Sequence, residues 1–125
     1  MSGLDERGLE TRREVLGDAH VDRAIEQTTE FTADFQRLIT RYAWGEIWSR
    51  PGLDRRTRSA ITMTALVALG RHEELELHVR AARRVGLGAD ELKEIFLQSA
   101  IYCGLPAANS AFAIAQRVLA EDKSE

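Results

Sequence analysis

The chain has 125 residues, which is enough for one domain that builds its own core without disulfides or a structural metal. Hydrophobic residues make up 44% of it and charged residues 30%, and the formal net charge of −3 gives no general basic field for nucleic acid. Because Cys103 is the only cysteine, one chain cannot form a disulfide, a CxxC redox pair or a cysteine-rich zinc site.

The N-terminal segment MSGLDERGLETRREV is charged throughout and lacks the apolar region of a signal peptide. No apolar run in the sequence approaches the length of a membrane span. We therefore expect a cytoplasmic protein that forms a single domain over residues 1–125 and has neither a membrane nor a nucleic-acid partner.

Apolar residues recur at helical spacing in three segments of the first half of the chain. A charged segment with an apolar stripe ends at Gly17-Asp18, and VDRAIEQTT follows as a short helix. The third segment has apolar residues at i, i+4, i+7, i+8 and i+11, namely Phe31, Phe35, Leu38, Ile39 and Tyr42. This spacing predicts an amphipathic helix that continues to the Trp44–Trp48 corner and ends at Pro51-Gly52.

The sequence of the second half of the chain predicts four helices, and the first of them is nearly all apolar. Arg58–Leu69 has few polar residues, so we expect this helix to lack a solvent face and to be the most buried element. Gly70 separates it from a Glu73–Val85 helix, DELKEIFLQSAIYCG gives another, and Pro106 is expected at the first position of the last. The predicted fold is an all-α bundle of about six helices.

Glu74 and His78 are four residues apart in the Glu73–Val85 helix and therefore lie on one face, a turn from each other. Leu75 and Val79 belong to the apolar stripe beside them. A carboxylate and an imidazole at the edge of a buried surface are typical of proton-transfer groups. The alternative is a surface ion pair with no catalytic role.

Two tryptophans, Trp44 and Trp48, precede four arginines in WGEIWSRPGLDRRTRS: Arg50, Arg55, Arg56 and Arg58. Aromatic and cationic groups together can hold a small anionic ligand. The same residues could instead form core packing and a solvated loop. Many small residues in PAANSAFAIAQRVLAED let another helix approach closely, which predicts that a second subunit covers part of the apolar surface.

Three blocks of sequence, which together extend over almost the full length of the chain, resemble the sequences of a known family. They are REVLGDAHVDRAIE, then FQRLITRYAWGEIWSRPGLDRRTRS, and finally HEELELHVRAARRVG with SAIYCGLPAANSAF. The chain closely resembles the 4-carboxymuconolactone decarboxylases, which are cofactor-independent enzymes of aromatic (protocatechuate) catabolism within the alkylhydroperoxidase D-like superfamily. The resemblance implies the helical fold of that superfamily, a homo-oligomer that is a trimer or hexamer, and a small anionic lactone as substrate.

Redox members of that superfamily have a CxxCxxxH motif on the corresponding helix. If their histidine is placed on His78, the two cysteine positions fall on Arg71 and Glu74. Cys103 belongs to a different helix and cannot restore the pair. The chain therefore departs from the redox pattern, which argues against a thiol peroxidase.

The family's reaction needs neither a cofactor nor a metal, because the lactone ring of the substrate accepts the electron pair that is left when carbon dioxide departs. We hypothesise that His78 is the general acid, held and charged by Glu74, and that Arg58 binds an anionic group of the substrate. Backbone amides after Pro106 would add donors. The remaining predicted substrate-binding residues are Tyr102, Cys103, Trp44, Trp48 and, across a subunit interface, His20.

Two other interpretations of the same residues stay open. One is a non-catalytic or differently specific oligomeric binding protein of the same fold, in which the Glu–His pair is structural. The other is a metal protein that uses His72, Glu74 and His78, but their i, i+2 and i+6 spacing does not converge on one helix face.

Overall fold

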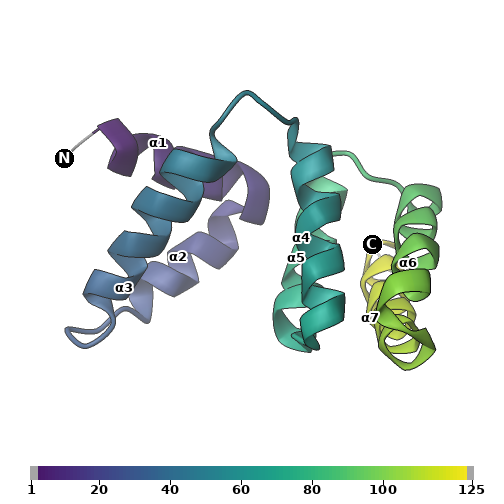
Figure 1. Cartoon of the computed structure of the whole chain (residues 1–125). Helices are drawn as coiled ribbons and strands as arrows, with labels where there is room; N and C mark the ends of the chain where they lie inside the picture. The colour runs from purple at the N-terminus through teal and green to yellow at the C-terminus, as the bar shows by residue number, and fades with distance from the viewer. Residues whose placement is uncertain (1–2, 124–125) are drawn as a thin grey trace. The chain divides into compact units, whose positions relative to one another are not determined.

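In the computed structural model, which describes residues 3–123, all regular structure is helical, and the predicted all-α class is confirmed (Figure 1). No strand occurs in these residues, and none of their helices combines the length and apolarity needed to cross a membrane. The elements are α1 (Gly3–Leu16), α2 (Asp18–Glu26), α3 (Ala33–Leu38), the π-helix η1 (Ile39–Trp48), α4 (Arg55–Leu69), α5 (His72–Arg84), α6 (Ala89–Cys103) and α7 (Leu105–Lys123).

The helices form two compact units. Unit 1 extends to Arg55 and contains α1, α2, α3 and η1. Unit 2 begins at Arg56 and contains nearly all of α4 together with α5, α6 and α7.

Unit 1 is organised by a close contact between α1 and η1 that only glycine permits. A Cβ atom at Gly8 would overlap the backbone carbonyl of Thr40, and a Cβ atom at Gly45 would overlap the carbonyl of Leu4. Both glycines are buried, so a side chain at either position could not turn toward solvent. The two backbones therefore touch directly, and the spacing between these helices is set by the absence of side chains.

The expected amphipathic helix of the first half differs from the structure at both ends. Phe31 precedes α3 in a turn and is 94% exposed, so the helix begins two residues later than the apolar spacing suggested. From Ile39 the backbone adopts the wider π-helical turn up to Trp48. At the end of this turn the Ser49 hydroxyl donates to the Trp44 carbonyl at 2.7 Å and lies 2.8 Å from Thr11 Oγ1, which links η1 to α1.

Unit 2 has a continuous apolar core to which all four of its helices contribute. Phe96 is fully buried at its centre and meets the ring of Phe112 edge-on, with ring centroids 5.9 Å apart. The buried members of the core are Met63, Val67, Leu75, Val79, Ala82, Leu87, Leu92, Phe96, Ala111, Ile114, Ala115 and Val118. Since α5 supplies three of them at helical spacing, this helix is seated firmly by its apolar stripe.

The prediction that the Arg58–Leu69 helix is the most buried element is wrong for the single chain. Buried positions in α4 are limited to Ser59, Met63 and Val67, which form one i, i+4 stripe. Leu69 is 70% exposed, and Ile61 is also exposed. An apolar circumference does not by itself bury a helix, because a small bundle covers only the stripe that faces its core.

Replacing Gly8 by Ala is expected to destabilise the protein by about 1–3 kcal/mol, because the added methyl group must push α1 away from η1. Gly52→Ala is the matched control, since no atom lies within 4 Å of the Cβ position there. The control should stay within about 0.5 kcal/mol of the parent. Chemical denaturation followed by circular dichroism measures both variants, and equal stabilities would contradict the proposed close contact.

Candidate active site

The predicted acid–base pair lies on α5 at the edge of the unit 2 core. Leu75 and Val79 on this helix are buried, His78 is half-buried, and Glu74 is exposed. Glu74 is one turn before His78 on the same side of the helix. The imidazole therefore borders the apolar interior while its predicted partner borders solvent.

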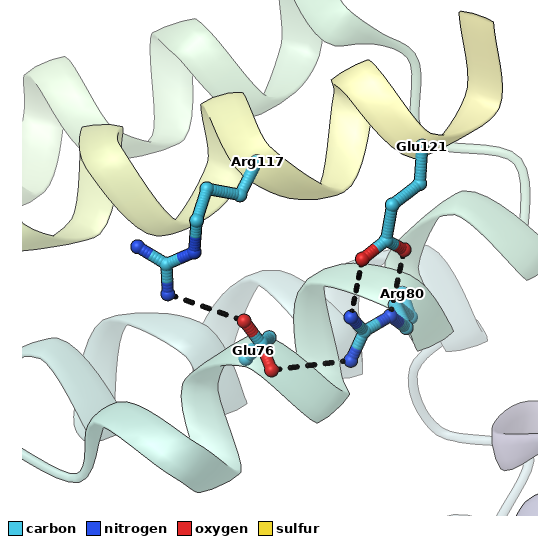
Figure 2. A network of polar contacts seen from close by, with 4 residues as sticks. All are labelled: Glu76, Arg80, Arg117 and Glu121. Carbon is cyan, nitrogen blue, oxygen red and sulfur yellow. Dashed lines mark hydrogen bonds and ion pairs between the residues drawn. The ribbon is translucent and has the colours of Figure 1, made fainter. Parts of the chain in front are cut away.

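Four charged side chains hold α5 against α7, as Figure 2 shows. Arg80 donates from Nε and Nη2 to the two carboxylate oxygens of Glu121, at 3.1 and 2.6 Å. Glu76 accepts from Arg80 Nη1 at 3.3 Å and from Arg117 Nη2 at 3.2 Å. Because the Arg80–Glu121 contact is bidentate and Glu76 bridges two arginines, the pairs act as a network that fixes the register of α5 on α7.

A further ion pair joins α5 to α7 near the end of α5. Arg83 Nε lies 2.8 Å from Asp122 Oδ2, and Arg83 Nη1 donates to the Leu87 carbonyl at 3.2 Å. At 3.6 residues per turn, His78 points about 200° around the helix from Glu76. Glu74 and His78 thus lie on the side of α5 that is turned away from the charged side that α7 covers.

Arg58, the predicted anion-binding residue, is half-buried in the first turns of α4. Two of its neighbours are engaged in ion pairs, Arg55 with Glu14 and Arg56 with Glu91. Glu91 also accepts a hydrogen bond from the Gly88 amide at 3.1 Å, at the start of α6. Arg55 and Arg56 therefore lie in the first turn of α4 and not in a loop, and their ion pairs support a structural role.

Tyr102 and Cys103 end α6. Cys103 is half-buried and packs against the unit 2 core, whereas Tyr102 is 80% exposed. Gly104 then turns the chain with a φ of 95°, and α7 begins at Leu105. The sequence predicted Pro106 as the first residue of the last helix, but it is the second.

The other three predicted substrate-binding residues, His20, Trp44 and Trp48, belong to unit 1. Trp44 is only 5% exposed and stacks on Trp48, with ring centroids 4.9 Å apart and an angle of 29° between the planes. In the single chain Trp44 is thus a core residue of its unit, as the alternative interpretation held. His20 is half-buried, and its pKa is lowered first by burial and then by the nearby charges of Arg12 and Arg23.

Arg12, which no pattern in the sequence singled out, lies in the interior of unit 1. It is 7% exposed, and burial lowers its pKa. Its guanidinium donates to Gln36 and Thr40, which are both neutral. The signal in the sequence was weak, because Arg12 lies among other charged residues in TRREV and its apolar neighbours recur only loosely.

Among residues 3–123, no three His, Cys, Asp or Glu side chains come close enough together to hold a metal ion.

The described residues thus form a small all-helical protein in which Glu74 and His78 lie at the edge of the unit 2 core. The chain belongs to the carboxymuconolactone decarboxylase family, whose model matches residues 33–117. The match covers α3, η1, α4, α5 and α6 and most of α7. It therefore includes both Glu74 and His78.

Relatives of this chain bear the names of two decarboxylases. The 4-carboxymuconolactone decarboxylase of Acinetobacter baylyi is 53% identical over 112 residues, which is 90% of this chain and 84% of that protein. A Pseudomonas putida protein of the same name is 54% identical, but over only 31% of this chain and 81% of its own length. The nitrosuccinic acid decarboxylase npaB of Metarhizium robertsii is 39% identical over 98% of this chain and 87% of its own length.

The network of charged side chains between α5 and α7 predicts how the free energy of unfolding changes at acidic pH. The hydrogen bond from Arg80 is the largest cause that lowers the pKa of Glu121. A carboxyl group whose pKa is lower in the folded protein stabilises it above the ordinary carboxyl pKa, and this stabilisation disappears as the pH falls through the lowered value. Glu121→Gln should therefore lose less stability than the parent over that acidic range.

Urea denaturation at a series of pH values measures the effect. Glu94→Gln is the control, because Glu94 is an exposed glutamate of α6 that makes no ion pair within the described part of the chain. It should follow the parent's curve. If Glu121→Gln also followed that curve, the network would contribute nothing to the acid dependence.

Proposed function

We propose that the chain catalyses the cofactor-independent decarboxylation of 4-carboxymuconolactone to 3-oxoadipate enol-lactone and carbon dioxide. One observation carries this proposal, the 53% identity over 90% of the chain with a protein that bears the name of that enzyme. The position of His78 and Glu74 beside the unit 2 core supports it, because the reaction includes the protonation of a carbon atom, which a positioned side chain can accelerate.

The chemistry follows from the substrate. The bond breaks between the carboxylate and the ring carbon that also bears the ring oxygen, and its electron pair moves through the ring double bond to the lactone carbonyl. The resulting dienolate takes up a proton on carbon, which gives the enol-lactone. Because the lactone is the electron sink, the protein has to bind anions, stabilise the developing oxyanion and deliver the proton.

We assign these tasks to residues of unit 2. His78 delivers the proton, and Glu74, one turn before it on α5, orients the imidazole. Arg58 binds the carboxymethyl group or the lactone oxygen by charge-assisted hydrogen bonds. Backbone amides in the first turn of α7 provide further donors. Tyr102 and Cys103 at the end of α6 are proposed to contact the substrate, whereas contacts from His20, Trp44 and Trp48 of unit 1 stay predictions from the sequence.

We also propose that the two units act as one catalytic domain over residues 1–125. The family match runs from residue 33 to residue 117 and so crosses the boundary at Arg55. The match to the Acinetobacter baylyi protein extends over 90% of the chain, which likewise includes parts of both units.

A second candidate is the decarboxylation of a nitro-substituted acid, which the 39% identity with the nitrosuccinic acid decarboxylase favours. Carbon dioxide release from 4-carboxymuconolactone and from nitrosuccinic acid, measured in parallel, separates the two. We expect the lactone to have the larger kcat/KM. The reverse order would favour the second candidate, and turnover of neither would favour the non-catalytic binding protein.

The protein is further proposed to form a homo-oligomer, a trimer or hexamer. In the single chain, apolar side chains remain exposed along α3 and η1, including Phe35, Leu38 and Tyr42. Their exposure supports burial against another copy. We propose a cytoplasmic location without a membrane partner. The net charge of −3 supports the further proposal that nucleic acid is not a partner.

Placing two charges on this face should weaken the assembly. The double variant Phe35→Lys with Leu38→Lys is expected to sediment as a smaller species than the parent at micromolar concentration, because the lysines would have to be buried. Asp34→Lys changes a neighbouring exposed residue and is the control. A parent protein that sediments as a monomer would contradict the proposed oligomer.

Replacing His78 by Ala should lower kcat by roughly 10²–10⁴-fold, since it removes the proposed general acid. Cys103→Ala is the comparison variant, because Cys103 is proposed only to contact the substrate and has no resolving cysteine for redox work. This variant should keep most of the turnover. A folded His78→Ala variant that decarboxylates at the parental rate would move the acid role to His20 or Tyr102.

Arg58→Lys retains the positive charge but loses the planar pair of donors that matches a carboxylate. We expect KM to rise by about tenfold, which is the loss of one charge-assisted hydrogen bond. Arg56→Lys is the control, because Arg56 is engaged with Glu91. Equal KM values for the two variants would show that Arg58 is not the anion-binding residue.

A further inference from the structure

Unit 1 contains a pocket of about 480 Å³ that is lined from α1, α2, α3 and η1. Its apolar side is formed by Leu9 and Ile25, and its polar side includes Arg12, Gln36 and Thr40. Asp5 and Arg37 complete the charged part of the lining and approach each other to 3.7 Å. The pocket thus combines an apolar wall with charged and polar groups, which is typical of a site for a small molecule.

Arg12 is a buried residue of this pocket and has a side-chain nitrogen without a hydrogen-bond acceptor. Among the pocket residues that the structure describes within 3–123, it is the only such residue that also forms no ion pair. Its Nη1 donates to Gln36 Oε1 and to Thr40 Oγ1, both at 3.2 Å, and its Nη2 donates to Gln36 Oε1 at 3.2 Å. Arg12 Nε is buried and finds no acceptor in the part of the chain that the structure describes.

These contacts leave one edge of the guanidinium unused. A guanidinium has five N–H donors. Both hydrogens of Nη1 are engaged, by Gln36 and Thr40, and one hydrogen of Nη2 is engaged by Gln36. The two that remain are Nε–H and the second Nη2–H, which point in parallel from the same side. That pair of donors is the one that binds the two oxygens of a carboxylate side-on.

The charge balance of the pocket favours the same ligand. Two arginines, Arg12 and Arg37, face a single carboxylate, Asp5, which contacts Arg37. Arg12 keeps its charge even when buried, although burial lowers its pKa. A buried charge that has only neutral partners is costly, and an incoming anion would remove much of that cost.

We infer that the Arg12 pocket binds the carboxylate group of a small organic acid, held side-on by Nε and Nη2 of Arg12. Leu9 and Ile25 contact the carbon chain of the acid, and Gln36 and Thr40 hold the guanidinium in position. The inference rests on unit 1 alone and does not depend on the proposed decarboxylation. A carboxylate side chain of a second copy is the other possible source of the same group.

The direct test is the Nε–H resonance of Arg12 in a ¹H–¹⁵N spectrum of the whole protein during a titration with succinate at constant ionic strength. We expect this resonance to move downfield and to saturate at millimolar succinate, because Nε–H gains a charged acceptor. Succinamide has the same carbon chain without charge and should leave it in place. The absence of a saturable shift would overturn the inference.

Calorimetry with succinate on two variants tests the residue itself. Arg12→Lys keeps the charge but loses the side-on pair of donors, and affinity should fall by at least about tenfold. Arg23→Lys is the matched control, since Arg23 is an exposed arginine of α2 that does not line the pocket, and it should bind as the parent does. Equal affinities for the parent and Arg12→Lys would overturn the assignment.

Sedimentation of the same proteins distinguishes the two sources of the carboxylate. If Arg12→Lys sediments as a smaller species and the parent does not bind succinate, the group belongs to a second copy and the free acid is excluded. Succinate should still bind His78→Ala with parental affinity. A protein that binds succinate without turning over 4-carboxymuconolactone would refute the proposed function and leave this site intact.

Discussion

The seating of α5 is the constraint on which the proposed chemistry depends. Its apolar stripe, which includes Leu75 and Val79, is buried in the unit 2 core, while Arg80 on another side is held by both oxygens of Glu121. Apolar burial supplies most of the stabilisation, and the exposed ion pairs add register more than energy. With two sides of the helix fixed, Glu74 and His78 remain on a third, at the border between core and solvent.

In unit 1, two helices are in direct backbone contact. Direct backbone contact through Gly8 and Gly45 sets the distance between α1 and η1. The same helices bury Arg12, whose neutral partners Gln36 and Thr40 satisfy only part of its hydrogen-bonding capacity. A tightly packed unit that still contains an incompletely paired charge is more easily explained by binding than by stability, because an apolar side chain of similar size would cost less to bury.

The fold class and the family could be predicted from the sequence, because helical periodicity and three ordered sequence blocks are local features. The position of α4 could not, since Ile61 and Leu69 are as apolar as Met63 and Val67 but lie outside the stripe that faces the core. Spacing placed Glu74 and His78 on one face, whereas Arg12 gave no recognisable signal. Its burial depends on Gln36 and Thr40, more than twenty residues away along the chain.

The central claim is that a fixed group of the protein protonates the dienolate formed from 4-carboxymuconolactone. The most direct measurement is the stereochemistry of deuterium in the enol-lactone formed by chelator-treated protein in D₂O. Proton delivery from one side makes the new CHD carbon a single stereoisomer, and this is the result that the account predicts. An equal mixture of both stereoisomers would mean that water protonates a released dienolate, and it would contradict the role assigned to His78.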